Sequence, residues 1–120
     1  MRIVKMSTFK DVYQKFINLA LATEQLSDFP ALDPIEKHLL ALLSHSWSNN
    51  KKMTVVESMN ITDELSTSTI FRYLKKLRQK GYLDLIVDEV DNRVKYVSPT
   101  KQCDKYFSKL GKLMSEASAS

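Results

Sequence analysis

Apolar residues recur at helical spacing near the start of the chain. The pattern predicts a helix that begins with a cap at Ser7 and fades near Ser27, and the turn-forming residues 28–30 follow it. Residues 1–6 are predicted to be a loose lead-in. One face of the predicted helix gathers the apolar side chains Phe9, Val12, Phe16, Ile17, Ala20 and Leu21.

A second helix has a strongly marked start. Asp33 suits the cap, Pro34 suits the first helical position, and Glu36 stands where a capping box places an acid. This helix is predicted to end near Trp47, before a polar connection. Its apolar arc is broad, which is typical of a core helix, and comprises Leu39, Leu40, Leu42 and Leu43.

Residues 65–83 form a basic stretch that is predicted to be the second helix of a pair. Thr54 caps a short helix over 55–61, and Ser66 caps the helix that follows and stops at Gly81. A short helix followed by a basic one is a helix-turn-helix pattern. The connection between them contains no glycine, unlike many such motifs, so its shape stays open.

The helix within 65–83 has two distinct faces when successive residues are turned by about 100°. Ile70, Leu74 and Leu77 share the predicted buried face, with Tyr73 at its edge. The opposite face is polar and basic along its length. It comprises Ser68, Arg72, Lys75 and Gln79, flanked by Thr69, Phe71, Lys76 and Arg78.

Residues 83–98 alternate in the manner of a two-stranded β-ribbon whose tip lies at Asp91–Asn92. Pro99 is predicted to stop the second strand, and Thr100 to cap a last helix. The tail 115–120 is small and polar and is predicted to be frayed. The last helix has an apolar face formed by Cys103, Tyr106, Phe107, Leu110, Leu113 and Met114.

Charge is distributed unevenly along this chain of 120 residues, which has the length of one domain. Residues 1–66 hold seven Lys and Arg against eight Asp and Glu, whereas residues 67–112 hold eleven against five. The positive charge is therefore concentrated on the basic helix, the ribbon and the last helix. This asymmetry favours a polyanionic partner, and a solvated basic face is the plain alternative.

The basic helix suits a DNA major groove, with the ribbon as a wing beside it. Small hydroxyl residues at its start allow close approach to phosphates, and Arg72 has the forked donors that recognise guanine. The alternatives are a simple cap at Ser66, solvated charges at Arg72 and Lys75, and a core role for Phe71. The candidate DNA-binding residues are Ser66, Thr67, Ser68, Thr69, Phe71, Arg72, Lys75 and Lys76.

Several short motifs also occur in the order known from one family. They open the core helix, bound the two helices of the pair, form the ribbon tip and lead into the last helix. They are Leu32–Pro34, Met53–Glu57, Leu65–Ile70, Leu74, Leu77, Lys80–Leu83, Asp91–Arg93 and Val97–Thr100. Through them, residues 33–114 resemble the winged-helix domain of the multiple-antibiotic-resistance repressor (MarR) family. The chain is short for that family.

The resemblance implies a homodimer on a roughly palindromic double-stranded DNA operator, with recognition helices in successive major grooves. It also implies that each wing reaches the flanking minor groove through Arg93, which Asp91 orients. A narrow minor groove concentrates negative potential, which suits an arginine. A simple charge pair at the ribbon tip is the alternative. The candidate DNA-binding residues of the wing are Asp91, Asn92, Arg93 and Lys95.

The terminal helices carry apolar stripes that a compact winged helix does not need. A second copy of the chain is the simplest cover for them, and packing on their own domain is the alternative. The candidate dimerisation residues are Phe9, Val12, Phe16, Tyr106, Phe107 and Leu110.

The expected fold is mainly α with a small β-hairpin wing. It has an N-terminal dimerisation helix within 1–32, a winged helix-turn-helix over 33–99, and a C-terminal dimerisation helix with a frayed tail over 100–120.

Other chemistries find little support in the sequence. His38, His45 and Cys103 lack a fourth ligand and the spacing of metal sites, and Cys103 lies on an apolar face where a thiol is inert. Catalytic motifs are missing, so we expect no enzyme, no cofactor and no metal. The single cysteine predicts a reducing, cytoplasmic location, and no signal peptide or membrane span is expected.

The leading hypothesis is a sequence-specific, double-stranded DNA-binding transcriptional regulator that acts as a homodimer, most simply as a repressor. One alternative is a plasmid or phage replication or partition protein built on the same winged helix. Another is an interaction adaptor in which Arg72, Lys75 and Arg93 bind an acidic protein surface. A small-molecule effector is open, and no residue supports one.

Overall fold

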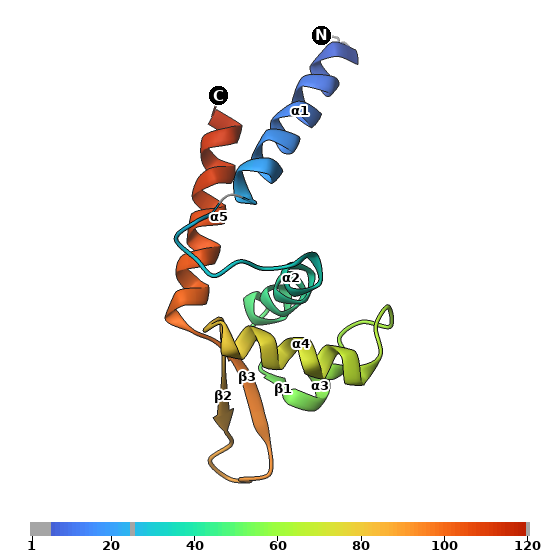
Figure 1. Cartoon of the computed structure of the whole chain (residues 1–120), viewed down its shortest axis with the longest axis vertical. Helices are drawn as coiled ribbons and strands as arrows, with labels where there is room; N and C mark the ends of the chain where they lie inside the picture. Colours follow the sequence, from blue (N-terminus) through green and yellow to red (C-terminus); the bar gives the residue numbers. More distant parts are fainter. Residues whose placement is uncertain (1–5, 25, 120) are drawn as a thin grey trace. The chain divides into compact units, whose positions relative to one another are not determined.

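Helices and short strands follow one another in residues 6–24 and 26–119, which the computed structural model describes (Figure 1). The chain forms two compact units: unit 1 comprises Met1–Phe29 and Lys105–Ser120, and unit 2 comprises Pro30–Asp104. The elements are α1 (Met6–Thr23), α2 (Pro34–Ser48), β1 (Met53–Thr54), α3 (Val55–Met59), α4 (Thr67–Gln79), β2 (Leu83–Val87), β3 (Lys95–Pro99) and α5 (Lys101–Ala119).

Side-chain caps start the helices of unit 2. At α2, Asp33 Oδ1 accepts the Glu36 N–H at 2.8 Å and Glu36 Oε1 accepts the Asp33 N–H at 2.9 Å. Thr54 and Glu57 form the same reciprocal capping box at α3, and Ser66 caps α4. Each box satisfies two backbone N–H groups that lack a partner within the helix. The predicted caps at these three helix starts are confirmed.

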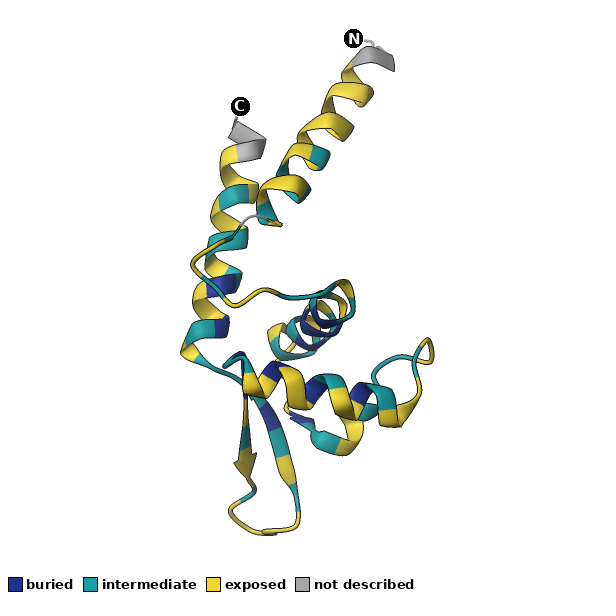
Figure 2. Ribbon diagram, in the orientation of Figure 1, coloured by how far each residue is buried: buried dark blue, intermediate teal, exposed yellow. Residues whose placement is uncertain are grey.

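The core of unit 2 lies between α2, α4 and the sheet, and Figure 2 shows its buried side chains in dark blue. Burial of each large apolar side chain contributes about 1.5–3 kcal/mol. The predicted buried face of α4 is confirmed, while Tyr73 is half-buried. Because α4 buries this face, its polar face is turned to solvent. The two helices contribute Leu39, Leu40, Leu43, Ile70, Leu74 and Leu77 to the core.

The sheet contains one strand that the sequence pattern did not predict. Its order is β1-β3-β2 with antiparallel pairing, and β1 joins it through Met53 opposite Val97. The predicted two-stranded ribbon is confirmed as β2 and β3. The strand β1 was not predicted, because two residues are too short to show an alternating pattern. Met53 and Val97 are both buried, and β1 therefore ties the start of α3 to the wing.

The strands β2 and β3 are shorter than predicted. They pair from Leu83 opposite Pro99 to Val87 opposite Lys95, and residues 88–94 form the loop between them. The predicted tip at Asp91–Asn92 lies in this loop. Pro99 is the last residue of β3 and not the residue after it, because a proline tolerates the end of a ladder.

The turn from α4 into β2 needs its glycine. Gly81 has a φ of +85°, a left-handed conformation that other residues adopt only with strain. The Tyr82 N–H donates to the Leu77 carbonyl and the Gly81 N–H to the Arg78 carbonyl, which closes the helix end. Thr100 caps α5 by accepting the Cys103 N–H at 3.1 Å, as predicted.

Unit 1 consists of α1, the residues that follow it, and most of α5. The helix α1 already includes Met6, so the predicted cap at Ser7 was wrong. It ends at Thr23, before the predicted Ser27, and Thr23 Oγ1 donates to the Ala20 carbonyl in its last turn. The lead-in residues 1–5 lie outside the described residues. The helix α5 runs to Ala119, so it includes most of the tail for which fraying is predicted.

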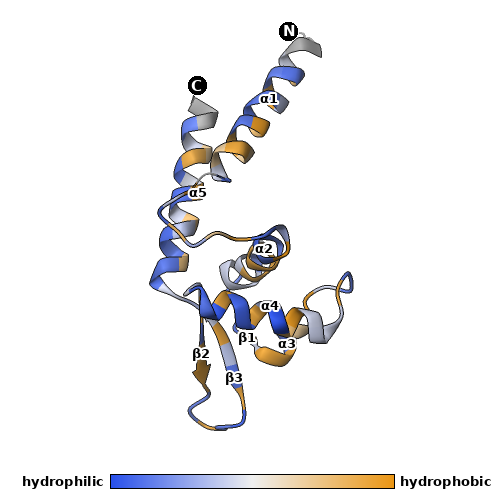
Figure 3. Ribbon diagram, in the orientation of Figure 1, coloured by the Kyte–Doolittle hydropathy of each residue, from blue (hydrophilic) through white to orange (hydrophobic). Residues whose placement is uncertain are grey.

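Apolar side chains of unit 1 remain largely exposed. Phe9, Val12 and Phe16 of α1 are 63%, 60% and 60% exposed, and Figures 2 and 3 show hydrophobic segments along this exposed helix. On α5, Tyr106 is buried and packs edge-on against Phe29 with ring centroids 5.5 Å apart. No helix in the described ranges combines the length and apolar character that a membrane span requires.

Candidate nucleic-acid interface

Hydroxyl groups cluster at the start of α4. Ser66 Oγ accepts the Thr69 N–H at 3.2 Å, donates to Thr69 Oγ1 at 2.8 Å, and lies 3.2 Å from Ser68 Oγ. Ser66, Thr67 and Ser68 are exposed, and Thr69 is partly exposed. The helix therefore starts with small, ordered polar groups beside the unpaired N–H groups of its first turn, where an anion is favoured.

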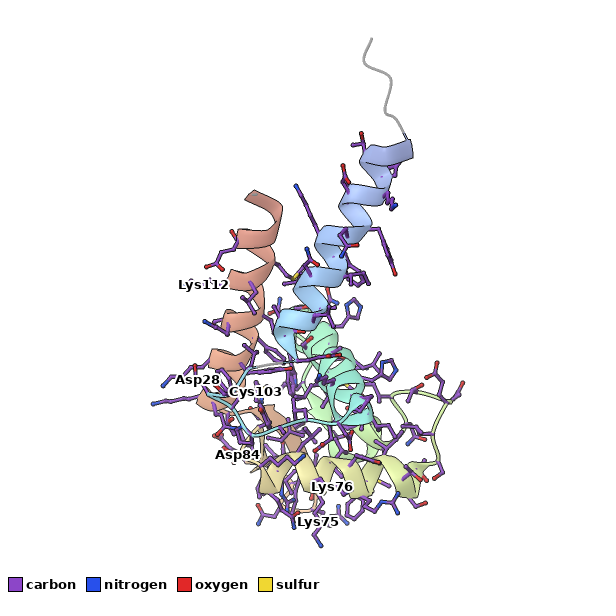
Figure 4. All side chains as sticks on the ribbon, turned by 45° about the horizontal axis from the view of Figure 1, so that its top comes forward. Asp28, Lys75, Lys76, Asp84, Cys103 and Lys112 are labelled. Carbon is purple, nitrogen blue, oxygen red and sulfur yellow. The ribbon has the colours of Figure 1, made fainter. Side chains whose placement is uncertain are left out.

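Basic side chains cover the outward face of α4. Arg72, Lys75 and Lys76 are exposed, and Figure 4 shows Lys75 on the side of α4 away from α2. Two of these cations lie over the Tyr73 ring, with Lys76 Nζ at 4.7 Å and Arg72 Cζ at 5.7 Å from its centroid. These contacts hold the charged groups near the helix and leave them open to solvent. In Figure 3, hydrophilic and hydrophobic segments alternate along α4.

A groove runs between α4 and the wing, and we call it the helix–wing groove. It consists of two adjoining hollows of about 200 and 540 Å³ that share Val55, Phe71, Arg78 and Leu85 as lining residues. The apolar part of its lining comes from α3, α4 and the sheet. The charged residues that line it are all basic: Lys75, Arg78, Arg93 and Lys95. An apolar floor with a cationic rim fits a sugar–phosphate chain.

The wing loop holds its arginine by a forked ion pair. Arg93 Nε lies 3.1 Å from Asp91 Oδ1 and Arg93 Nη2 lies 3.2 Å from Asp91 Oδ2, and the Arg93 N–H also donates to Asp91 Oδ1. The Arg93 side chain is still 91% exposed. The hydrogen bonds from Arg93 lower the pKa of Asp91. A guanidinium has five N–H donors, so Arg93 keeps donors for another partner. Asn92 and Lys95 are exposed nearby.

A second carboxylate shapes the same loop from inside. Asp88 Oδ2 accepts the backbone N–H groups of Asp91 at 2.9 Å and Val90 at 3.0 Å. These bonds lower the pKa of Asp88, and its negative charge raises the pKa of Tyr96 on β3. The hydrogen bonds to Asp88 and Asp91 therefore order the loop, and they fix the position of Arg93.

Cys103 is buried in the first turn of α5. Burial raises the pKa of its thiol to about 12, so it is protonated at neutral pH. Within the described residues, no group of three His, Cys, Asp or Glu side chains is placed to bind a metal.

The structure adds residues that the sequence pattern did not single out. Arg78 was assigned to the flank of α4, but it lines both hollows of the helix–wing groove. Val55 and Val56 of α3 contribute to the floor, and Val56 is 68% exposed. The sequence shows only that these two valines follow the cap at Thr54, which does not mark them as part of a groove. Phe71, a candidate DNA-binding residue with a core role as the alternative, lines the groove and is 50% exposed, so it is not a core residue.

Comparison with known proteins places the fold. No protein-family model and no curated protein matches the sequence. Among solved structures, a mutant of MepR from S. aureus is similar with a TM-score of 0.70 and 18% identity, over 99% of this chain and 81% of that one. The transcriptional regulator Tm0710 from Thermotoga maritima is similar with a TM-score of 0.63 and 17% identity, over 93% and 75% of the two chains. A mutant of MarR from E. coli gives a TM-score of 0.57 and 15% identity, over 96% and 79%.

The fold is MarR-like. The predicted fold class, mainly α with a winged helix-turn-helix, is confirmed. In a MarR-like fold, α3 and α4 occupy the places of the two helices of the helix-turn-helix, and the β2–β3 loop is the tip of the wing. The candidate residues of α4 and of the wing therefore lie on the two parts of the fold that flank the helix–wing groove.

Proposed function

We propose that this protein is a sequence-specific transcriptional regulator that binds double-stranded DNA as a homodimer and represses by covering a promoter. One observation carries the proposal: the exposed basic face of α4 and the wing are joined by a groove whose charged lining residues are all basic. A duplex presents phosphates on both sides of its major groove, and such a surface can neutralise them while a helix reads base edges. The likeness to Tm0710, described as a transcriptional regulator, supports the same function.

The recognition helix reads the major groove in this proposal. The small hydroxyl residues at its start let the backbone approach the DNA closely and donate to phosphates or bases. Arg72 lies one turn further along, exposed, and its fork matches guanine O6 and N7. Lys75 and Lys76 lie beyond it and contact phosphates.

The helix–wing groove holds one DNA strand between the major and minor grooves. Lys75 and Arg78 approach the strand from α4, and Arg93 and Lys95 approach it from the wing. The apolar floor contacts the sugars, which carry no charge. This assignment gives Arg78 a phosphate-binding role.

The wing tip inserts Arg93 into the flanking minor groove or holds it against the backbone. Asp91 orients the guanidinium before DNA arrives, so less side-chain freedom is lost on binding. A narrow minor groove attracts such a group electrostatically.

The apolar side chains of unit 1 form the dimer surface. One chain leaves three apolar side chains of α1 exposed: Phe9, Val12 and Phe16. A twofold interface would bury them. Phe107 and Leu110 of α5 are half-buried and add to this surface, whereas Tyr106 is already buried on Phe29 and supports it from within.

A salt series with random and selected duplexes tests the proposal. Selection of duplexes from a random pool should yield a preferred site, and log affinity should fall linearly with log salt because phosphate contacts release counterions. An interaction adaptor would bind no duplex even at low salt. That result would remove the regulator proposal and favour an acidic protein partner for the same basic surface.

Two variants of α4 separate base reading from phosphate binding. Arg72→Ala should cost about 1–3 kcal/mol on the selected site and relax its base preference. Lys76→Ala should weaken all duplexes alike and reduce the salt slope by about 1. Equal losses on every sequence for both variants would refute this division of roles.

A further inference from the structure

Two exposed apolar side chains lie on the otherwise basic surface between α3, α4 and the wing. Val56 of α3 is 68% exposed and Phe71 of α4 is 50% exposed, and both line the larger hollow of the helix–wing groove. We call these two residues the apolar patch. The helices that carry them lie next to each other in unit 2 (Figure 1). The other apolar residues of the groove are half-buried or buried, so the apolar patch is the most accessible apolar part of its lining.

The backbone that carries the apolar patch is held in place. Val56 lies in the first turn of α3, and the capping box of Thr54 and Glu57 fixes the start of that helix. Phe71 directly follows Ile70, which is fully buried and anchors this turn of α4 in the core. The apolar patch is therefore preorganised, and a ligand has to order only its two side chains.

The charges around the apolar patch determine what kind of partner can cover it. Glu57, the acid next to Val56 in the sequence, accepts the Thr54 N–H and lies 3.6 Å from Lys51 Nζ. A partner of this surface must therefore combine negative charge with an apolar group that reaches the apolar patch. The charged residues that line the two hollows are Lys75, Arg78, Arg93 and Lys95.

A DNA duplex offers this combination wherever it contains thymine. Its backbone carries the phosphates, and the C5 methyl of thymine is the apolar group that base pairs display in the major groove. Adenine, guanine and cytosine present hydrogen-bonding groups there, and apolar side chains such as phenylalanine contact the thymine methyl. The apolar patch therefore matches thymine among the four bases.

We propose that Phe71 and Val56 are specificity-determining residues that bind the C5 methyl groups of thymines in the operator. In the proposed function, the adjacent Arg72 recognises guanine. Neighbouring side chains of α4 then read two different chemical features, a hydrogen-bonding edge and a methyl group. Each half-site of the operator carries thymine at the position that faces the apolar patch. The inference rests on the proposed function as a DNA-binding regulator.

The first experiment removes one methyl group at a time from the DNA. Each thymine of the selected operator is replaced by deoxyuridine, which forms the same base pair and lacks only the C5 methyl. At the positions that face the apolar patch, the replacement should weaken binding of the wild type about fourfold per methyl group, the equivalent of one buried methyl. Replacement of the other thymines should leave the affinity unchanged.

Variants of the apolar patch show whether these side chains cause the effect. Phe71→Ala and Val56→Ala each truncate an exposed side chain, so the core of unit 2 is retained. Each variant should bind the thymine and deoxyuridine operators with equal affinity at the position that its side chain contacts. A merely structural loss would weaken both operators and keep the fourfold difference between them.

Ile86→Ala is the matched control. Ile86 is 53% exposed and lines a different hollow, beside Trp47. It lies on the face of the sheet opposite to that of Leu85, which lines the helix–wing groove, because successive strand residues point to opposite faces. This variant should keep the wild-type response to deoxyuridine.

A second readout locates the contact directly. In 5-iododeoxyuridine, iodine replaces the methyl group, and ultraviolet light couples this position of the base to a side chain in contact with it. Trypsin cleaves after Lys52 and Arg72, so a single peptide, residues 53–72, contains both residues of the apolar patch. Fragmentation of the crosslinked peptide should place the base on Phe71 or Val56, and Phe71→Ala should reduce the yield.

The outcomes distinguish failure of the inference from failure of the proposed function. If no duplex binds even at low salt, the proposed function is refuted and the inference with it. If duplexes bind with a preferred site but no deoxyuridine replacement weakens binding, the function stands and the inference is overturned. A methyl dependence that persists in both variants, or a crosslink confined to peptides of the wing, would overturn the inference as well.

Discussion

Unit 2 and unit 1 treat their apolar residues in opposite ways. With the exception of Tyr106, the buried hydrophobic residues of the described chain belong to unit 2. In unit 1, Phe9, Val12 and Phe16 stand open to solvent on α1. The difference teaches that unit 2 completes its own core, while unit 1 has surface left for a partner.

The largest expected effect comes from the core of unit 2. Leu39→Ala should lower the free energy of unfolding by about 2–5 kcal/mol, because Leu39 is fully buried and leaves a cavity. Trp47 is the single tryptophan and lies in unit 2, so its fluorescence in a denaturant series reports on that unit.

Leu21→Ala is the matched control in unit 1, since Leu21 is 54% exposed. It should leave the Trp47 transition nearly unchanged. Similar losses for both leucine variants would mean that the two units do not differ as described.

The next effect concerns the open surface of unit 1. Phe16→Ser should raise the dissociation constant of the dimer by about tenfold or more, because a twofold interface loses two buried rings. Sedimentation equilibrium measures this constant. The Trp47 unfolding transition, extrapolated to a common monomer concentration, should stay in place. A wild-type chain that sediments as a monomer at micromolar concentration would contradict the dimer.

A smaller effect is expected from the caps. Thr54→Ala should cost about 1 kcal/mol in the Trp47 transition, because it removes the acceptor for the Glu57 N–H and breaks the capping box of α3. Thr8→Ala, an exposed position on α1, should cost nothing measurable in the same transition. A cost for both would show that the cap is not responsible.

The smallest effect is a local response of the wing to acid. The pKa of Asp88 is lowered in the folded chain by the backbone N–H groups of Asp91 and Val90. At a pH above the ordinary aspartate pKa of about 4, the ionised Asp88 carboxylate stabilises the ordered loop. This stabilisation is lost as the pH falls through the lowered pKa that Asp88 has in the folded chain. Amide NMR shifts of Val90 and Asp91 should move below about pH 4. In Asp88→Asn, these shift changes should disappear. If they persist in that variant, a group other than Asp88 causes them.

Much of unit 2 could be predicted from the sequence because its signals are local. The capping residues Asp33, Thr54 and Ser66 act on backbone groups within a few residues, and the buried face of α4 follows from helical spacing. The strand β1 could not be predicted, because it exists only through pairing with the distant Val97. The role of Arg78 in the groove was missed for the same reason, since the wing that forms the other wall is far away in sequence.

Unit 1 was predicted less well because its signals are weaker. The helix α1 comprises Met6–Thr23, whereas the sequence pattern predicted residues 7–27. Tyr106 was assigned to the dimer surface from its helical position, yet Phe29 covers it. The long-range hydrogen bonds of the turn at Lys80–Tyr82 also could not be predicted from the sequence pattern, because they connect residues up to 52 positions apart. Hydrogen bonds between residues so far apart in the sequence produce no periodic pattern of hydrophobic and polar positions.

The order of the wing loop changes how its charge should be counted. The segment from Asp88 to Asp91 looks poorly suited to approach a polyanion, since it carries three acids and no base. Yet two of those carboxylates point into the loop, where one is shared by two backbone N–H groups and the other by Arg93. Removing these acids would raise the net charge of the wing and still deprive it of its shape. A variant that neutralises these acids to strengthen DNA binding would therefore also release Arg93 from its ordered position.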